Sequence, residues 1–351
     1  MHNYKMGFCD TMPTMRLTLF IAATFLAALP LAAARKTMDV YFVDVEGGQA
    51  TLIVSPSGKS LLVDTGWPGF EERDAKRIAA AAKQAGVKQI DYLMITHFHR
   101  DHVGGVTQLA ARLPILNFVD HGGNIEKGKG AEELTAAYDK VKAGGKHVIV
   151  KPGDKIPVPG LDVQVITSGG EAIAQPLKGA GGANSFCADE KRRDPDPSEN
   201  ARSVGVLITL GKFRMIDLGD LTWNKELDLV CPSNKVGTVD VYLSTHHGMD
   251  MSGPRAIVHE LKPRVAIMNN GARKGGTPVA WKVIKSSPGI EDLWQVHFAV
   301  AGGSEANVAE AMIANPPEAC EGHYLRLSAD PSGEFSVWNS RNKYQKTYKA
   351  R

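Results

Sequence analysis

The sequence predicts an α/β protein built in layers, in which two β-sheets pack face to face and helices cover their outer faces. Its first part holds short β-rich runs separated by glycine, proline and serine turns, a pattern typical of a strand meander. These runs cover residues 40–45, 50–54 and 60–64. From residue 204 onward the second half of the chain repeats an alternation of strand-like and helix-like patterns, which favours one layered domain.

The later elements follow, in chain order, from the period of their apolar residues. We expect helices over 71–85, 103–113 and 131–143, strands over 90–95 and 117–119, and a hairpin-like stretch over 146–167. In the second half we expect strands over 204–210, 215–220 and 239–243 and helices over 255–261 and 279–285.

Residues 169–203 form a long stretch without periodicity. They include five glycines and the mixed-charge run 189–196. A loop of this length inside a compact domain is either functional or disordered. Because it leads from residue 200 into the strand that precedes Asp220, we interpret it as an active-site lid.

The N-terminus resembles a secretory signal peptide. An apolar run from Leu17 to Leu29 follows Arg16, and small residues lead up to Ala34. A basic start, a short apolar segment and a small-residue site are typical of export signals. We therefore expect cleavage after Ala34, an exported protein in the periplasm or outside the cell, and a mature domain over 35–351. No later run reaches the length of a membrane span, so none is predicted in the mature part.

Charge and cysteine content restrict the partners and the compartment. The leader carries Lys5, Arg16 and Asp10, so its removal lowers the formal charge from +3 to +2. A nearly neutral chain has no electrostatic basis for strong nucleic-acid binding.

Three of the four cysteines remain after cleavage: Cys187, Cys231 and Cys320. In an oxidising compartment these allow one disulfide and one free thiol. A bond between Cys187 and Cys231 would fasten the long loop.

The segment from Thr96 to His102 carries three histidines and an aspartate directly after the apolar run 90–95. Imidazole and carboxylate are the ligands of catalytic zinc, and other divalent ions of the first transition row accept them. In an irregular turn at a strand end, His97 and His99 are able to face one ion while Asp101 and His102 face another. The alternative is a polar surface loop, which the density of histidines disfavours.

This motif, His-x-His-x-Asp-His, resembles that of the metallo-β-lactamase-fold hydrolases. The chain looks most similar to the hydrolase domain of DNA-uptake competence-channel proteins and to secreted phosphorylcholine esterases. The resemblance spans roughly residues 38 to 300 and rests on four further stretches, which are 62–66, 199–220, 243–248 and 267–278. It implies a four-layer αββα sandwich in a single domain, with Asp64 supporting the ligand loop and 267–271 as the last strand.

The same resemblance implies a dinuclear centre. Asp220, at the end of an apolar strand, would bridge two divalent ions, for which we expect zinc, with manganese or iron as alternatives. One of His246 and His247 would complete the second site. We prefer His247, because the ligand often precedes a glycine in this family, and the other histidine would then be a supporting donor or a proton shuttle. Asp101, Asp220 and His247 are the residues that we expect to be catalytic.

Two positions depart from the family pattern. Asn200 stands where many members place a third histidine for the first ion. His121 either approaches the metals instead or is a structural histidine, which we favour. Gly275 and Gly276 precede Thr277 and Pro278, where competence-type relatives carry Gly-His-Pro.

Two expected helix starts, at Ser252 to Pro254 and at Thr277, lie near the ligands, with Arg273 and Lys274 beside the second. Free backbone N–H groups and cations of this kind favour an anionic substrate. The residues that we expect to bind substrate are His121, Asn200, Ser252, Asn270 and Arg273.

Three functions are compatible with these observations. The first is an exported metal-dependent hydrolase of phosphodiesters or other phosphoryl compounds, acting by attack of a metal-bound hydroxide. The second is hydrolysis of an amide, lactone or thioester on the same metal core. The third, a binding module with a degraded site, is disfavoured by the intact Asp101, His102 and Asp220.

Overall fold

The computed structural model describes Gly7 and residues 37–351, so the expected signal peptide lies outside the described residues apart from Gly7. Residues Ala34–Arg351 form one compact unit. No helix in the described part of the chain is both long and apolar enough to cross a membrane.

The first sheet combines a meander, a parallel block and the C-terminal strands. Its strands are β1 (Met38–Phe42), β2 (Thr51–Val54), β3 (Ser60–Val63), β4 (Ile90–Met94), β5 (Ile115–Asp120), β6 (Lys146–Ile149), β16 (Leu325–Ala329), β17 (Glu334–Asn339) and β18 (Gln345–Lys349). Their order is β18-β17-β16-β1-β2-β3-β4-β5-β6. The pairs from β3 to β6 are parallel and the others are antiparallel.

The second sheet begins antiparallel and becomes parallel after β11. Its strands are β7 (Lys155–Ile156), β8 (Asp162–Ser168), β9 (Glu171–Ala172), β10 (Gly205–Leu210), β11 (Phe213–Asp217), β12 (Val241–Leu243), β13 (Val265–Met268), β14 (Asp292–His297) and β15 (Ile313–Asn315). The order is β15-β14-β13-β12-β11-β10-β8-β7, with β9 paired to β8. The four pairs from β11 to β15 are parallel, so their carboxyl ends meet at one edge.

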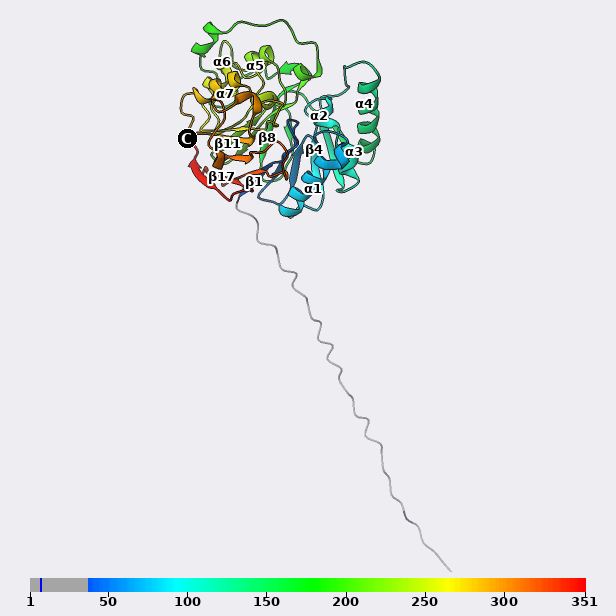
Figure 1. Cartoon of the computed structure of the whole chain (residues 1–351). Helices are drawn as coiled ribbons and strands as arrows, with labels where there is room; N and C mark the ends of the chain where they lie inside the picture. The colour runs from blue at the N-terminus through cyan, green and yellow to red at the C-terminus, as the bar shows by residue number, and fades with distance from the viewer. Residues whose placement is uncertain (1–6, 8–36) are drawn as a thin grey trace, which may run out of the picture. The chain divides into compact units, whose positions relative to one another are not determined.

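Helices cover the outer face of each sheet, as Figure 1 shows. The helices α1 (Arg73–Gln84), α2 (Arg100–Val103), α3 (Val106–Ala110) and α4 (Lys129–Lys142) lie beside the first sheet, and α5 (Trp223–Val230), α6 (Arg255–Leu261) and α7 (Pro278–Lys285) lie beside the second. Six 3₁₀ segments also occur in the described chain: Phe70–Glu72, Ser185–Asp189, Glu199–Arg202, Thr245–Gly248, Val300–Gly302 and Glu310–Met312.

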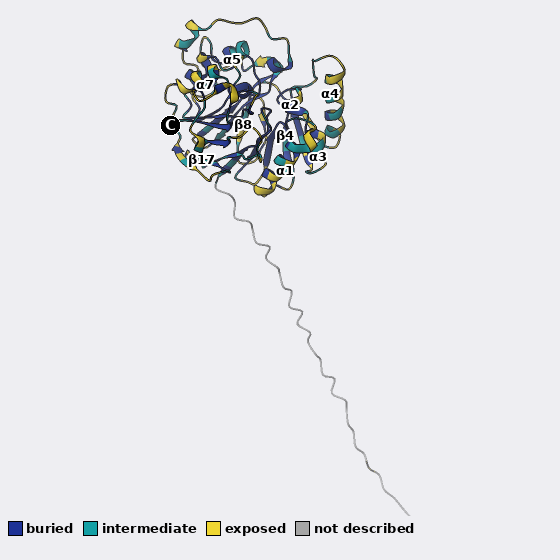
Figure 2. Ribbon diagram, in the orientation of Figure 1, coloured by how far each residue is buried: buried dark blue, intermediate teal, exposed yellow. Residues whose placement is uncertain are grey.

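Three apolar clusters separate these layers. One lies between the two sheets and includes Phe213, Trp294 and Phe335. A second joins the first sheet to α1, α3 and α4, and a third joins the second sheet to α5, α6 and α7. The inner strands of both sheets are accordingly buried, whereas the edge strand β6 is exposed (Figure 2). The predicted layered α/β sandwich is confirmed.

The predicted helix over 103–113 is wrong in one respect, because the structure divides this region into α2 and α3. The N–H of Gly105 donates to the carbonyl of Gly66, and the carbonyl of Asp101 accepts from Gln49. Both groups are therefore diverted from helical pairing. A Cβ atom on Gly105 would lie 2.1 Å from the carbonyl oxygen of Thr65, so this close approach requires glycine.

Two further expectations need correction. The stretch 146–167 is not a single hairpin, because β6 pairs with β5 in the first sheet whereas β7 and β8 belong to the second. The segment 267–271 does not contain the last strand, because β14 to β18 follow it and β16 to β18 complete the first sheet beside β1.

The long stretch 169–203 is packed against the second half of the domain. The expected disulfide between Cys187 and Cys231 is present. The side chain of Asn184 donates to the carbonyls of Val230 and Ala256, which ties the loop to α5 and α6. At its end, Glu199–Arg202 returns the chain toward the candidate metal ligands.

Candidate metal centre

The predicted ligands lie in segments that follow strands of both sheets. His97 and His99 lie in the turn after β4 of the first sheet, and Asp101 and His102 lie in the short helix α2, so the expected irregular turn does not include them. Asp220 follows β11 and the 3₁₀ segment Thr245–Gly248 follows β12 in the second sheet. Because polar turns at the carboxyl ends of parallel strands are where α/β proteins usually place their sites, this arrangement fits a functional centre. His97, His102 and His247 are completely buried.

Four of the predicted ligands form a compact group: Asp101, His102, Asp220 and His247. Each offers one ligand atom, and these atoms lie within 4.8 Å of one another. The Nε2 atom of His102 lies 3.2 Å from Asp220 Oδ2 and 3.3 Å from Asp101 Oδ2. The Nε2 atom of His247 lies 3.2 Å from Asp220 Oδ1. This set of two imidazoles and two carboxylates matches the donors of a catalytic divalent ion.

Three polar atoms of this group are buried and have no hydrogen-bond partner: His102 Nε2, His247 Nε2 and Asp220 Oδ1. Leaving a buried polar atom unsatisfied is costly, so such atoms need an explanation. Coordination of a cation would satisfy all three atoms. The residues present therefore fit divalent metal.

The other predicted ligands lie beside this group. The Nε2 atom of His97 is 3.0 Å from Nδ1 of His99. The Nε2 atom of His246 is 3.3 Å from Asp220 Oδ2. Asp220 thus faces both His246 and His247, so the structure brings both members of that pair to the same carboxylate.

Asp64 orients the histidines of the first turn. It accepts hydrogen bonds from His102 Nδ1 at 2.6 Å and from Thr96 Oγ1 at 2.7 Å. The hydroxyl of Thr96 in turn accepts from His97 Nδ1 at 3.0 Å. These bonds place protons on Nδ1 and leave the Nε2 lone pairs facing the centre, a common role of residues behind metal ligands.

Two other histidines are oriented in a similar way. His246 Nδ1 lies 3.2 Å from the hydroxyl oxygen of Ser252, which itself donates to the carbonyl of Leu221. His99 has its Nε2 3.2 Å from Glu126 Oε1, so its Nδ1 faces His97. Each contact fixes which ring nitrogen remains free for an ion.

The electrostatics of the metal-free centre indicate a site for positive charge. Burial opposes ionisation of Asp101 and Asp220, yet His102 and neighbouring cationic groups hold the pKa of both carboxyls well below the usual value. Burial also opposes a charge on His102, but Asp220, Asp101 and Asp64 hold its pKa well above normal. Burial lowers the pKa of His246 to about 4, so this imidazole is neutral near pH 7.

The structure engages the predicted substrate-binding residues in different ways. Asn200 is buried in the 3₁₀ segment Glu199–Arg202 at the end of the long stretch 169–203, with its Oδ1 unpaired. His121 lies 2.9 Å from Glu199, the arrangement of a structural histidine. Asn270 donates to the carbonyls of Gly271 and His297, and Arg273 pairs with Glu318 at the surface. Neither of these two shows a contact with the metal ligands.

Only one of the two residues that we expected to cap a helix does so. Ser252 does not cap α6, because Pro254 occupies the N-cap position and the hydroxyl of Ser252 is committed to His246 and Leu221. Its contribution to the centre is therefore through His246. Thr277 does cap α7, since its side chain accepts from the N–H of Ala280.

Three more residues border the centre, and the sequence pattern indicated only Lys274 among them, as a cation near the ligands. Lys274 pairs with Asp101, Glu126 contacts His99, and Gln49 donates to Asp217 at 2.7 Å. Only Lys274 had a local signal, as one of the two cations before Thr277. Glu126 and Gln49 lie in segments without a motif, and only the folded chain brings them to their partners.

Comparison with known proteins shows which class the chain resembles. Residues 43–191 match the model of the Metallo-beta-lactamase superfamily. Among solved structures, the metallo-beta-lactamase fold protein YhfI of Bacillus subtilis matches with 13% identity, a TM-score of 0.45 and coverage of 74% of this chain and 96% of that one.

Particular relatives include the ComE operon protein 3 of Bacillus subtilis (strain 168), which is 25% identical over 249 residues. This match covers 66% of the chain but only 28% of that protein, so the chain spans little more than a quarter of its length. A UPF0173 metal-dependent hydrolase of Cupriavidus necator is 25% identical over 276 residues, which are 73% of this chain and 83% of that protein. The family and these relatives support a metal-dependent hydrolase.

Proposed function

We propose that this protein is an exported hydrolase of phosphodiesters or other phosphoryl compounds that works with two divalent ions. The observation that carries this proposal is the position of Lys274, whose ammonium group pairs with Asp101 at the edge of the buried ligand group. A cationic side chain at the rim of a metal site favours a substrate that carries negative charge.

The charges around the centre support the same conclusion. Two carboxylates, Asp101 and Asp220, face a set of imidazoles, and the lowered pKa of His246 keeps its ring neutral. With two divalent ions in place, positive charge exceeds negative charge even before Lys274 is counted. An anionic phosphoryl group would meet this excess, whereas an uncharged amide or lactone gains less from it.

His97, His99 and His246 would hold one ion, Asp101, His102 and His247 the other, and Asp220 both. We propose zinc for this nitrogen and oxygen donor set, with manganese or iron as alternatives. When bound, the ions would supply a nucleophile at neutral pH and polarise the oxygen under attack.

The chain's own residues would position the reaction. Asp101 or Asp220, the two carboxylates of the buried group, would orient a water molecule and receive its proton. Lys274 would hold a substrate oxygen. His246, held through its Nδ1 by Ser252, lies beside Asp220 and would keep its Nε2 free for an ion. The proton taken up by the carboxylate would then pass to the leaving group.

A substrate panel tests this proposal. Metal-free protein, and protein reloaded with zinc, manganese or iron, would be assayed with bis-p-nitrophenyl phosphate, p-nitrophenyl phosphate, a chromogenic β-lactam and a lactone. We expect metal-dependent hydrolysis of the phosphodiester to exceed that of the neutral substrates. Preferential hydrolysis of the β-lactam or the lactone would favour the alternative class, and no metal-dependent turnover of any substrate would favour a binding module.

A matched variant tests whether the measured hydrolysis arises at this centre or from a contaminating enzyme. Asp220→Asn keeps the size of the side chain but removes the charge, and it should reduce the rate on every substrate by at least about 100-fold. An unchanged rate would show that the observed hydrolysis does not arise at this centre.

Export is the other part of the proposal. It rests on the sequence of residues 1–34 and on the disulfide between Cys187 and Cys231, which suits an oxidising compartment. Mass spectrometry of protein from the periplasm or medium should give a chain that begins at Arg35. An intact leader on protein in that fraction would contradict this part of the proposal.

A further inference from the structure

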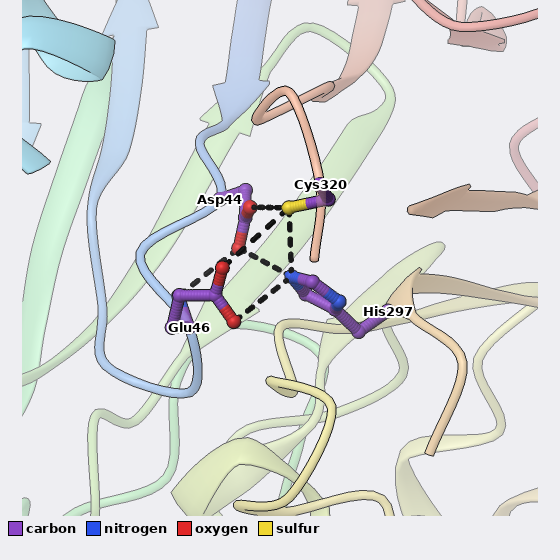
Figure 3. A group of neighbouring side chains, drawn as sticks. All are labelled: Asp44, Glu46, His297 and Cys320. Carbon is purple, nitrogen blue, oxygen red and sulfur yellow. Dashed lines mark hydrogen bonds and ion pairs between the residues drawn. The ribbon is translucent and has the colours of Figure 1, made fainter. Parts of the chain in front are cut away.

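A second group of metal-ligating side chains lies outside the centre described above. It consists of Asp44, Glu46, His297 and Cys320, here called the Cys320 cluster (Figure 3). The four side chains point toward one another, and their ligand atoms lie within 4.8 Å of one another. Asp44 and His297 are completely buried.

The separations within the Cys320 cluster resemble those around a single ion. Nε2 of His297 lies 2.8 Å from Asp44 Oδ1, 3.4 Å from Glu46 Oε2 and 3.8 Å from Cys320 Sγ. The sulfur lies 3.1 Å from Asp44 Oδ2 and 3.5 Å from Glu46 Oε1. Ligands at normal zinc bond lengths on a tetrahedron are roughly 3.3 to 3.7 Å apart, so small adjustments would suffice.

We infer that the Cys320 cluster is a second metal site, separate from the proposed catalytic centre, that binds one zinc-type divalent ion. Its donor set of one thiolate, one imidazole and two carboxylates suits zinc and similar transition ions better than calcium or magnesium, which prefer oxygen ligands alone. Four protein ligands would close the coordination shell, as in structural zinc sites.

Arg77 lies beside the Cys320 cluster, but its single positive charge does not take the place of a metal ion. Its guanidinium donates to Asp44 Oδ2 at 2.6 Å and approaches Glu46 Oε1 at 3.4 Å. One cation beside two carboxylates leaves a net negative charge. A divalent ion that displaces the thiol proton of Cys320 would bring the whole group to neutrality, with Arg77 as the partner that orients Asp44.

The backbone near Cys320 allows a close approach to Arg77. A Cβ atom on Gly322 would lie 2.2 Å from Nε of Arg77, so glycine lets the Cys320 segment close over the guanidinium. An ion also has a way in, because the side chain of Glu46 is 24% exposed and Cys320 is only partly buried.

The three segments that meet here come from both sheets. Asp44 and Glu46 follow β1 of the first sheet, His297 ends β14 of the second, and Cys320 lies in the connection from β15 to β16. An ion would therefore bind the sheets together at this edge.

The segment with Asp44 and Glu46 continues to the proposed catalytic centre. Gln49 donates its backbone N–H to the carbonyl of Asp101 at 3.2 Å, and a Cβ atom on Gly48 would lie 2.4 Å from the same oxygen. The ion would consequently stabilise the loop that supports Asp101, which gives this site a structural role.

Cobalt spectroscopy tests the assignment directly, because only the Cys320 cluster contains a cysteine. All proteins would carry Cys9→Ser, so that Cys320 is the one thiol outside the disulfide. Metal-free protein titrated with Co²⁺ should develop a near-ultraviolet thiolate-to-cobalt charge-transfer band. Cys320→Ser should abolish the band and lower the bound zinc by one equivalent per chain.

Two further variants keep this test independent of folding and of the proposed function. Glu46→Gln alters a partly exposed ligand and should weaken zinc at this site by about 10-fold or more without loss of the folded circular-dichroism spectrum. His102→Ala disrupts the other centre and should leave the cobalt band intact. Failure of the phosphodiesterase assay would not affect either readout.

Stability gives a second readout. Zinc should raise the melting temperature of the parent protein more than that of Cys320→Ser, and the two should respond alike in a chelator. Absence of the cobalt band, or equal zinc content in the parent and Cys320→Ser, would overturn the proposal and leave a charged network centred on Arg77.

Discussion

The Nδ1 atom of His102 donates a hydrogen bond of 2.6 Å to Oδ2 of Asp64, a residue that lies behind the proposed ligands. Both side chains are completely buried. Asp64→Asn would leave the ligands themselves unchanged but weaken the group that orients His102. We expect the affinity of the second ion to fall by about 10- to 100-fold, the usual effect of such supporting residues, as measured by competition with a chelating dye.

Asp120→Asn is the matched control for Asp64→Asn. Asp120 is also completely buried, but it accepts from Tyr138 and His147 instead of from a proposed ligand. The control should lose stability while retaining metal affinity. Equal losses of affinity in both variants would show that Asp64 acts through general stability.

Asn200 offers a test of the first ion. Its Oδ1 is buried without a partner, and His121 is engaged by Glu199. Because His99 is 30% exposed whereas the ligands of the second ion are buried, we expect the first ion to leave first on titration with a chelator. Asn200→His should tighten that ion by about 10- to 100-fold by adding a stronger donor.

Metal loss should then be biphasic in the parent protein, and the first phase should remove most of the hydrolytic rate. Simultaneous loss of both ions, or unchanged affinity in Asn200→His, would mean that another residue already completes the first site. His121, which lies 2.9 Å from Glu199, would then be the residue to test.

Lys274 provides a test of the anionic substrate. Its ammonium pairs with Asp101, and its side chain is 30% exposed. Lys274→Met removes a positive charge that repels the proposed second ion. That ion should therefore bind about 2- to 5-fold more tightly, which is the scale of one partly exposed ion pair. The KM for a phosphodiester should rise at the same time. Looser metal binding together with an unchanged KM would refute both roles of Lys274.

Glu226, which is not one of the proposed metal ligands, should make the stability of the folded protein depend on pH. Burial raises the pKa of this carboxyl from 4.5 to about 8, although Oε2 accepts from the N–H of Gly253 at 2.6 Å. A raised pKa in the folded state means that the protonated form is favoured on folding. Its contribution to stability is therefore complete below pH 4.5 and is lost as the pH rises through about 8.

Glu226→Gln is neutral at every pH and should remove this loss. Compared with the variant, the parent protein should lose on the order of 5 °C in melting temperature between about pH 5 and about pH 9. Parallel melting curves for parent and variant across that interval would show that Glu226 does not titrate as described.

The part of the centre that could be predicted from the sequence is local. His97, His99, Asp101 and His102 lie within six positions directly after an apolar run. Asp220 and the pair His246 and His247 also follow apolar runs, so residue order alone indicates their location. The layered fold was predictable for a similar reason, because strand and helix periods are local properties of the chain.

Long-range contacts were not predictable in this way. Lys274 and Asp101 are 173 positions apart, and Asp44 and His297 are 253 apart. No local pattern marks Asp44, Glu46 or Cys320 as ligands. The break between α2 and α3 was missed because it depends on hydrogen bonds from Gly105 to Gly66 and from Gln49 to Asp101, segments that only the folded chain brings together.

The metal content of purified protein, compared between the parent and Asp220→Asn, shows whether Asp220 holds a two-ion centre. Both proteins should carry Cys320→Ser, so that only the proposed catalytic centre is counted. We expect two divalent ions per chain in the parent and loss of at least one in Asp220→Asn, because this carboxylate faces both His246 and His247. A parent without bound metal after exposure to zinc, or full metal content in Asp220→Asn, would contradict this expectation.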